Sequence, residues 1–242
     1  MQKPLVSLIG PAHRTHLWQG FYDRIITKLP FEVVFVSDKK PETTLPENFR
    51  WFYSTVKPAQ CFEIAFREAK GDFIIWCGDD LTYTPYAIDE AVAIQSQYDY
   101  KTMVFFRFFE DGRECTKNQT TWDQKYNLIA TGLISKQVIN EAGGLADTRF
   151  VCGLWDCDLI MRIYALGGQS VYTKEGYCNE PHLEFHKKEA NFATTWQWEN
   201  EEFKRLWMDR TGGAYLSRLE PFQPYYDTDI LIKSQGNKGK WS

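Results

Sequence analysis

Apolar and polar positions come in alternating blocks along the first hundred residues, and the blocks predict strands and helices in turn. Short apolar runs typical of strands lie at residues 5–9, 31–36, 49–54 and 73–77. Between them, apolar residues recur at helical spacing from Thr15 onward. Pro58 begins a second helix that Gly71 closes, and Thr84-Pro85 begins a third that runs to about residue 97.

This order of elements predicts an α/β fold with a mainly parallel central sheet and helices on both of its faces. Ligands of such sheets bind in the crevice outside the carboxyl ends of the strands. Pro11, Asp38 and the pair Asp79-Asp80 each follow or end a predicted strand. We therefore expect one crevice to collect these residues.

The second half of the chain is less regular. Strands are predicted at 102–109 and 126–135, and helices at about 136–143, 156–166 and 194–208. From residue 212 onward the chain is polar and is expected to pack loosely. We predict one catalytic-type domain over residues 1–211, with a smaller antiparallel element, and a C-terminal extension over 212–242.

Composition excludes some classes of function. The chain has 242 residues and a formal net charge of -4, with no concentrated basic patch, so a nucleic acid is not expected as partner. Its six cysteines form no CxxC pair, which favours reduced thiols in a cytoplasmic protein. The first residues lack the apolar core of a signal peptide, and no run is long enough to predict a membrane span.

Two carboxylates at the end of a buried strand are the first candidate for chemistry. Asp79 and Asp80 follow the apolar run of residues 73–77, with Gly78 between. Adjacent carboxylates suit a hard divalent cation that also binds substrate phosphates. A solvated turn that caps the next helix is the alternative. Asp38, after the second strand, is either a turn former or an acceptor for a base or ribose.

A second acidic group lies at the start of the predicted helix 156–166. Asp158 has a partner four residues on, Arg162, whereas Asp156 has none in sequence and is left as a candidate general base. Either aspartate would also be favoured at a helix start by the helix dipole. His182 and His186 lie four apart, and either could complete a metal site begun by Asp80.

Four motifs in this order resemble family 2 glycosyltransferases of the GT-A fold, over roughly residues 4–190. They are LVSLIGPAHR, EVVFVSD, AKGDFIIWCGDDLTYTP and GGLADTRFVCGLWDCDLIMRIYALGG. The resemblance implies a single GT-A domain that binds a nucleoside diphosphate sugar, with a UDP-sugar favoured, and transfers the sugar to a hydroxyl of a glycan or other acceptor.

The resemblance also implies residue roles. Pro11 and Asp38 would hold the nucleotide, Asp79 would face the ribose, and Asp80 would ligate Mn²⁺ or Mg²⁺ at the diphosphate. Asp156 matches the aspartate that deprotonates the acceptor in inverting members, and His182 or His186 would complete the metal site, with a slight preference for His186.

The sequence departs from the family pattern at two positions. Gly78 stands where many members have the first aspartate of the DxD triplet, and Trp155 replaces the acidic residue before the catalytic aspartate, where it is predicted to offer an aromatic platform to the acceptor. Motifs of processive synthases are absent, so single-sugar transfer is expected. One alternative is a catalytically inactive carbohydrate- or nucleotide-sugar-binding domain. The other is a sugar-1-phosphate nucleotidyltransferase, but that class has a Gly-rich basic loop after the first strand, and the segment GPAHRTH does not match it.

Overall fold

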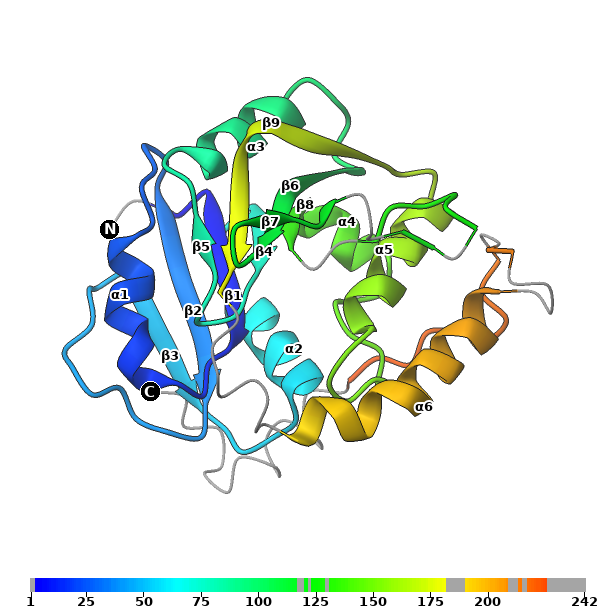
Figure 1. Cartoon of the computed structure of the whole chain (residues 1–242), viewed down its shortest axis with the longest axis horizontal. Coiled ribbons are helices and arrows are strands. Elements are labelled where there is room, and N and C mark those ends of the chain that lie inside the picture. Colours follow the sequence, from blue (N-terminus) through cyan, green and yellow to red (C-terminus); the bar gives the residue numbers. More distant parts are fainter. Residues whose placement is uncertain are drawn as a thin grey trace.

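The structure is a computed structural model that describes residues 3–116, 120–121, 123–128, 131–181, 190–208, 213–214 and 217–225. Within this part of the chain, strands pair into one sheet in the order β3-β2-β1-β4-β8-β6-β9-β5, with β7 paired to β6 (Figure 1). The strands are β1 (Val6–Pro11), β2 (Phe31–Ser37), β3 (Phe49–Tyr53), β4 (Phe73–Trp76), β5 (Thr82–Tyr83), β6 (Thr102–Glu110), β7 (Arg113–Glu114), β8 (Gly132–Ser135) and β9 (Gln169–Glu180).

The helices alternate with the strands in the first half of the chain, as the apolar pattern predicts. They are the 3₁₀ turn η1 (Thr15–Leu17) and the α-helices α1 (Trp18–Asp23), α2 (Pro58–Glu68), α3 (Ala87–Gln95), α4 (Lys136–Glu141), α5 (Trp155–Ala165) and α6 (Ala190–Trp207). The first helix ends at Asp23 and the third begins at Ala87, so both are shorter than their apolar patterns suggest.

The four strands β1 to β4 form the parallel half of the sheet. β1 lies between β2 and β4 and is parallel to both, and β3 continues the parallel order beyond β2. β8 is antiparallel to β4 and to β6, so the chain direction reverses in the second half. The predicted mixed α/β fold with helices on both faces is confirmed.

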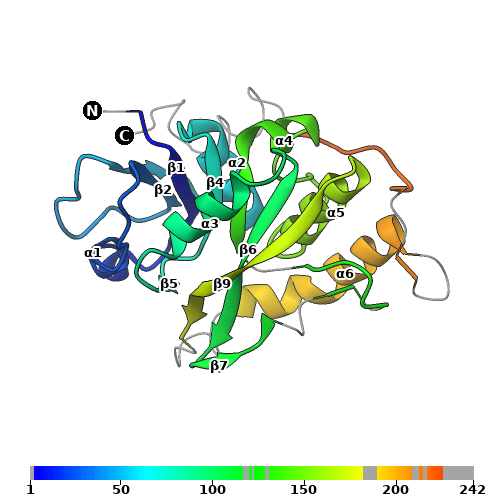
Figure 2. The same cartoon turned by 90° about the horizontal axis from the view of Figure 1, so that it is seen from above.

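Aromatic packing fixes α1 on one face of the parallel half. The ring of Trp18 stacks on Phe49 at 5.6 Å and meets Phe35 edge-on at 5.9 Å, and Phe21 lies 5.2 Å from Phe35. Because side chains alternate along a strand, Val34 and Val36 face the opposite side. Figure 2 shows α2 on that side of β1 and β2.

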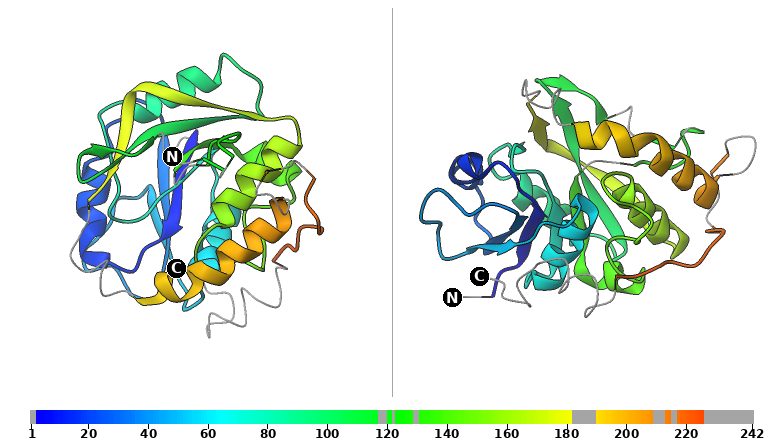
Figure 3. Two further views of the ribbon diagram at one scale, coloured as in Figure 1. Left: turned by 45° about the vertical axis from the view of Figure 1, so that its right-hand side comes forward. Right: turned by 90° about the horizontal axis from the view of Figure 1, so that it is seen from below.

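The second half was predicted less well. β9 was missed, although it runs parallel to β6 along most of that strand, with an irregularity between Phe105 and Arg107. The strand predicted over 126–135 covers only Gly132–Ser135 as β8. α6 runs beside α5 in both views of Figure 3.

Residues 217–225 do not pack loosely, so that expectation is wrong for this part of the tail. Tyr225 is buried, and its hydroxyl donates to the carbonyl of Phe150 at 3.3 Å. The backbone N–H of Gln223 donates to the buried carboxylate of Asp147 at 2.9 Å. The boundary at residue 211 stays a prediction.

Candidate functional site

The carboxyl ends of three neighbouring parallel strands collect the residues predicted to bind the donor. Pro11 ends β1 and pairs with Val36 of β2, one residue before that strand ends. Asp38 follows β2, and Asp79-Asp80 follow β4, which pairs with β1 on its other side. Since β1, β2 and β4 are neighbours in the sheet (Figure 1), the predicted donor residues share one edge of it.

Arg14, in the loop after β1, binds both members of the acidic pair. Its backbone N–H donates to Asp79 Oδ2 at 2.8 Å, and its Nε donates to Asp79 Oδ1 at 2.7 Å. Its Nη2 also contacts Asp79 Oδ1 and lies 2.9 Å from Asp80 Oδ2. One guanidinium thus spans two carboxylates that come from a different strand. Nothing in the apolar pattern marks Arg14, and it was not predicted.

The two carboxylates are deeply buried, since Asp79 is 1% exposed and Asp80 5% exposed. Burial raises the pKa of Asp79 above its ordinary value, and the Arg14 guanidinium acts in the opposite direction. Both oxygens of Asp79 accept hydrogen bonds from Arg14. Arg14 therefore covers Asp79 in this structure, and the role expected for Asp79 at the ribose stays a prediction.

Gly78 leaves room for the Asp80 carboxylate. A Cβ at position 78 would lie 2.6 Å from Asp80 Oδ1, closer than non-bonded atoms approach. Any side chain at position 78 would therefore displace the Asp80 carboxylate.

His13 contacts the other predicted nucleotide residue. Its Nδ1 lies 2.8 Å from Asp38 Oδ1, and both side chains are exposed. Asp38 is thus held at the sheet edge by a side chain from the β1 loop, with its carboxylate still open to a ligand. Only proximity in the fold reveals this partner, since the two residues lie in separate motifs.

Asp156 lies in the first turn of α5 and keeps part of its surface accessible. Its Oδ1 accepts a hydrogen bond from the backbone N–H of Cys157 at 2.8 Å. Burial raises the pKa of Asp156 to about 6, with a smaller contribution of the same sign from Glu199. A carboxylate with this pKa is ionised at pH 7 and is more basic than an ordinary aspartate, as a general base requires.

The loop that leads into α5 is held by Glu199, from the middle of α6. The Glu199 carboxylate is fully buried and accepts hydrogen bonds from three consecutive backbone N–H groups. They belong to Val151 at 2.6 Å, Cys152 at 2.8 Å and Gly153 at 3.1 Å. The next residue, Leu154, has a φ of 55°, which is a strained left-handed conformation for a branched side chain. Glu199 was not predicted, because it lies far from this loop in sequence.

Trp155 does not present the aromatic platform predicted for it. Its side chain is 3% exposed, and its ring lies 4.4 Å from that of Phe62 and 6.1 Å from that of Trp76. Trp76 is the last residue of β4 and comes three positions before Asp79. Trp155 therefore packs the start of α5 against the strand that carries the acidic pair, so both acidic groups lie at the same end of β4.

Asp158 has a structural role, as its spacing to Arg162 suggests. Arg162 Nε donates to Asp158 Oδ2 at 2.9 Å, and the Asp158 carboxylate is fully buried. Its Oδ1 accepts hydrogen bonds from Trp207 Nε1 at 2.8 Å and from Arg218 Nε at 3.0 Å. One carboxylate thus joins α5 to the end of α6 and to the C-terminal segment.

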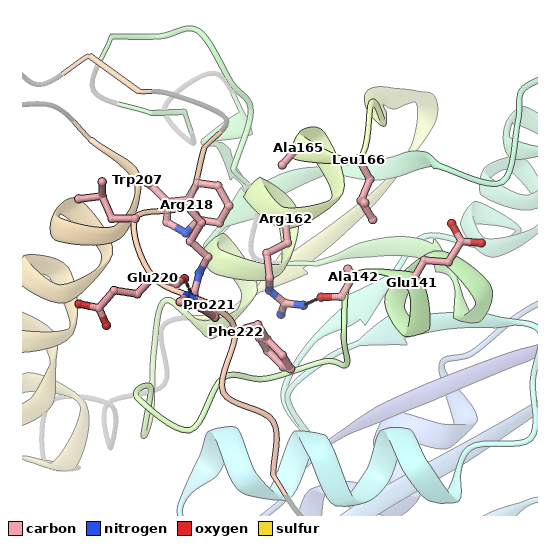
Figure 4. Close-up of a pocket in the computed structure, with 11 residues that line it drawn as sticks. Glu141, Ala142, Arg162, Ala165, Leu166, Trp207, Arg218, Glu220, Pro221 and Phe222 are labelled. Atoms are coloured by element: carbon pink, nitrogen blue, oxygen red, sulfur yellow. Dashed lines mark hydrogen bonds between the residues drawn. The ribbon is translucent and has the colours of Figure 1, made fainter.

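A cavity of about 460 Å³ lies beside this network and away from the acidic pair. Figure 4 shows Arg162 and Arg218 side by side at its wall, with Phe222 next to Arg162. The guanidinium of Arg162 already donates to the carbonyls of Ala142, Gly144 and Leu145, and it stacks on the Phe222 ring at 4.2 Å. These arginines are structural and are not available as an anion site.

The metal prediction rests on few donors. Across the part of the chain that the structure describes, no cluster of three or more His, Cys, Asp or Glu side chains is arranged to hold a metal. His182 and His186, the predicted completing ligands, lie outside the described residues. The two carboxylates at Asp79 and Asp80 fit a hard divalent cation in chemistry, although Arg14 now spans them.

Comparison with known proteins identifies the fold. No protein family and no curated protein matches the chain in sequence. Among solved structures, S. aureus TarS 1–349 in complex with UDP-GlcNAc matches with a TM-score of 0.58 and 15% identity, over 74% of this chain. GalNAc-T7 with UDP, GalNAc and Mn²⁺ matches with a TM-score of 0.58 and 13% identity, over 75% of this chain. The chain has the GT-A fold. The predicted fold is thereby confirmed.

The GT-A match extends over only part of each neighbour. This chain covers 58% of TarS 1–349 and 44% of GalNAc-T7. At these sequence identities the likeness establishes only how the helices and strands are arranged. The ligands of the neighbours can therefore support no more than a proposal about what this GT-A chain binds. None of its described helices is both long and apolar enough to cross a membrane.

Proposed function

We propose that this chain is a glycosyltransferase that moves a single sugar from a nucleoside diphosphate sugar to an acceptor hydroxyl with inversion. The observation that carries the proposal is the place of Asp156. It lies at the same end of β4 as the acidic pair, retains accessible surface, and makes no ion pair within the described part of the chain. A carboxylate of this kind beside a donor crevice suits proton removal from an acceptor.

The donor would lie along the carboxyl ends of β1, β2 and β4. Pro11 would line the nucleotide side of the crevice, and the exposed Asp38 would accept hydrogen bonds from the base or ribose. A uridine nucleotide is favoured, because TarS is described in complex with UDP-GlcNAc and GalNAc-T7 with UDP. Asp80 would hold Mn²⁺ or Mg²⁺, with Asp79 behind it.

In this mechanism each residue of the chain has a limited task. Asp156 takes the proton of the acceptor hydroxyl as its oxygen attacks the anomeric carbon. The sheet edge and the start of α5 align the two substrates, which lowers the entropic part of the barrier. A divalent cation bound at Asp80 would offset the negative charge of the departing diphosphate. Inversion follows from a single displacement.

A ligand screen tests the donor half of the proposal. Thermal unfolding is measured with UDP, GDP, dTDP and CMP, each with and without Mn²⁺. A ligand present at 100 times its Kd adds about 2.7 kcal/mol of stability, which is easily measured for a domain of this size. UDP with Mn²⁺ should give the largest shift. No shift with any nucleotide would contradict the proposal.

A second candidate function is a binding domain without catalysis, and the contact between Arg14 and the acidic pair favours it, since a cation already fills that position. Donor hydrolysis separates the two. A transferase releases sugar from its donor to water at a slow rate, and Asp156→Asn should reduce transfer to an acceptor far more than donor binding. A binding domain leaves the donor intact in both forms.

A further inference from the structure

The buried carboxylates of Asp79 and Asp80, in the loop after β4, share a single cation, Arg14, in the loop after β1. The guanidinium of Arg14 makes two hydrogen bonds to Asp79 and one ion pair to Asp80, and its side chain is 16% exposed. Charges this deeply buried are costly unless paired, and two adjacent carboxylates also repel each other. Arg14 supplies the compensating charge, because a guanidinium stays protonated at any ordinary pH.

The same positions are those where a divalent cation would bind. A cation at Asp80 would approach an oxygen that lies 2.9 Å from Arg14 Nη2, and two positive groups at that distance repel strongly in a buried site. The guanidinium and the metal therefore cannot both occupy the Asp80 oxygen. Metal binding at this oxygen has to include movement of Arg14.

The contacts indicate which part of Arg14 moves. Asp79 is held by the Arg14 backbone N–H at 2.8 Å as well as by Nε, whereas Nη2, which lies 2.9 Å from Asp80 Oδ2, is at the tip of the side chain. A rotation of the end of the side chain would release Asp80 and keep the backbone contact to Asp79. The guanidinium at the tip is also the part that could donate hydrogen bonds to a diphosphate oxygen, since Arg binds phosphate well.

We propose that Arg14 is an internal cation that competes with the divalent metal for Asp80 and leaves it when the metal binds. This inference rests on the proposed function only for the identity of the metal site. Its consequence is measurable without any substrate: in the free protein, Arg14 lowers the affinity for the metal. Removing its charge should raise that affinity.

Calorimetric titration with Mn²⁺ alone tests the proposal. Arg14→Gln removes the charge and keeps a polar side chain, and it should bind Mn²⁺ about tenfold more tightly than the wild type or better, a difference of about 1.4 kcal/mol. Arg14→Lys keeps the charge on a side chain of shorter reach, so it should bind Mn²⁺ more tightly than the wild type but less tightly than Arg14→Gln. The double variant Arg14→Gln with Asp80→Asn should lose the gain, because the negative charge of the Asp80 carboxylate is gone.

A matched control comes from Arg50, which also bridges two carboxylates. Its Nη1 donates to Glu32 at 2.9 Å and its Nη2 to Glu68 at 3.1 Å, away from the candidate site. Arg50→Gln should leave Mn²⁺ affinity unchanged. An equal gain in Arg50→Gln would mean that any uncovered acidic pair binds the metal, and would overturn a specific role for Arg14.

Other results also decide the question. Circular dichroism and thermal unfolding establish that each variant is folded. If Arg14→Gln does not fold, Arg14→Lys takes its place: its shorter reach should weaken its hold on Asp80 and raise Mn²⁺ affinity, and an affinity equal to or below that of the wild type overturns the proposal. Affinity in folded Arg14→Gln equal to or below the wild type also overturns it, whatever the transfer assay gives. Absence of glycosyl transfer in the wild type, together with a gain in Mn²⁺ affinity in Arg14→Gln, would instead contradict the proposed function alone.

Discussion

The carboxylate of Glu199 accepts hydrogen bonds from the backbone N–H of Gly153 through both of its oxygens, at 3.3 and 3.1 Å. This contact joins the middle of α6 to the loop that leads into α5, in whose first turn Asp156 lies. Because the loop passes through a left-handed residue, Leu154, before α5 begins, its course is not the one the chain would adopt unaided. The position of the candidate base therefore depends on a residue of a distant helix.

Replacing Glu199 by Gln should weaken this loop. The amide keeps the shape of the carboxylate but loses the charge and one acceptor, so the protein should lose about 1.5–3 kcal/mol of unfolding free energy. Turnover should fall while donor affinity is retained. Urea unfolding and transfer kinetics measure the two effects. Glu201→Gln, at an exposed position of the same helix, is the control and should change neither. Equal behaviour of the two variants would count against the role of Glu199.

The parallel half of the fold was predictable because each of its strands contains a short apolar run that ends at Gly or at a polar residue. Phe73–Trp76 is the clearest case, and it placed Asp79 and Asp80 at the correct sheet edge. β9 was not predictable in this way. It carries Lys174, Glu175 and Gly176 within one strand and is partly exposed along most of its length, so no apolar run marks it.

The site was predictable only as far as its residues follow strands or begin helices. The pairing of Asp158 with Arg162 was predicted from their spacing and is confirmed, whereas the role of Asp156 as the base stays a prediction. Arg14 and Glu199 were missed because each acts through a contact with a residue far away in sequence. Trp155 was misassigned because the sequence of a motif does not distinguish an aromatic side chain that packs in the core from one that lies on the surface.

Asp158→Asn should destabilise the protein much more than an exposed helix pair would suggest. Sequence spacing alone predicts a loss of about 0.2–0.5 kcal/mol for such a pair. In the fold, however, the Asp158 carboxylate is fully buried and binds both Arg162 and Arg218. Removing its charge leaves two guanidinium groups poorly compensated, so a loss of about 3–5 kcal/mol is expected.

Urea unfolding measures this loss, and a surface pair provides the comparison. Arg107 Nη2 lies 3.0 Å from Glu114 Oε2, with the two side chains 32% and 41% exposed. Glu114→Gln should cost less than about 1 kcal/mol, because solvent screens the exposed pair. Similar losses in the two variants would show that burial does not set the strength of the Asp158 network.

Binding of a nucleoside diphosphate should depend on a divalent metal and on Asp80. Asp80→Ala is expected to weaken UDP binding in the presence of Mn²⁺ by about tenfold or more, and EDTA should weaken wild-type binding similarly. Calorimetry measures both. Asp72→Ala, just before the amino end of β4 and exposed to solvent, is the control and should bind as the wild type does. Equal UDP affinity with Mn²⁺ and with EDTA would remove the metal role.

Stability should depend on pH through Asp156. Its pKa is raised to about 6 in the folded protein and is lower in the unfolded chain. The folded state therefore binds the proton more tightly, so ionisation of Asp156 costs stability as pH rises through the range between the ordinary aspartate pKa and about 6. Asp156→Asn removes this cost. The variant should unfold at a higher temperature than the wild type at pH 8, and this difference should shrink or vanish at pH 4. An equal difference at both pH values would exclude the assigned cause.

The same substitution tests the chemistry. Asn keeps the shape of Asp156 and can still accept a hydrogen bond from the N–H of Cys157, but it cannot take a proton. Turnover should therefore fall by about 10²- to 10⁴-fold, the usual contribution of a general base, with little change in donor affinity.

In the wild type, turnover should rise with pH through about 6, as Asp156 ionises. Single-turnover transfer over a range of pH, beside a donor titration, measures both effects. Asp158→Asn loses stability but keeps the Asp156 carboxylate, so the pH profile of turnover in that variant should have the same midpoint as in the wild type. If Asp156→Asn transfers sugar at the wild-type rate, another residue takes the proton.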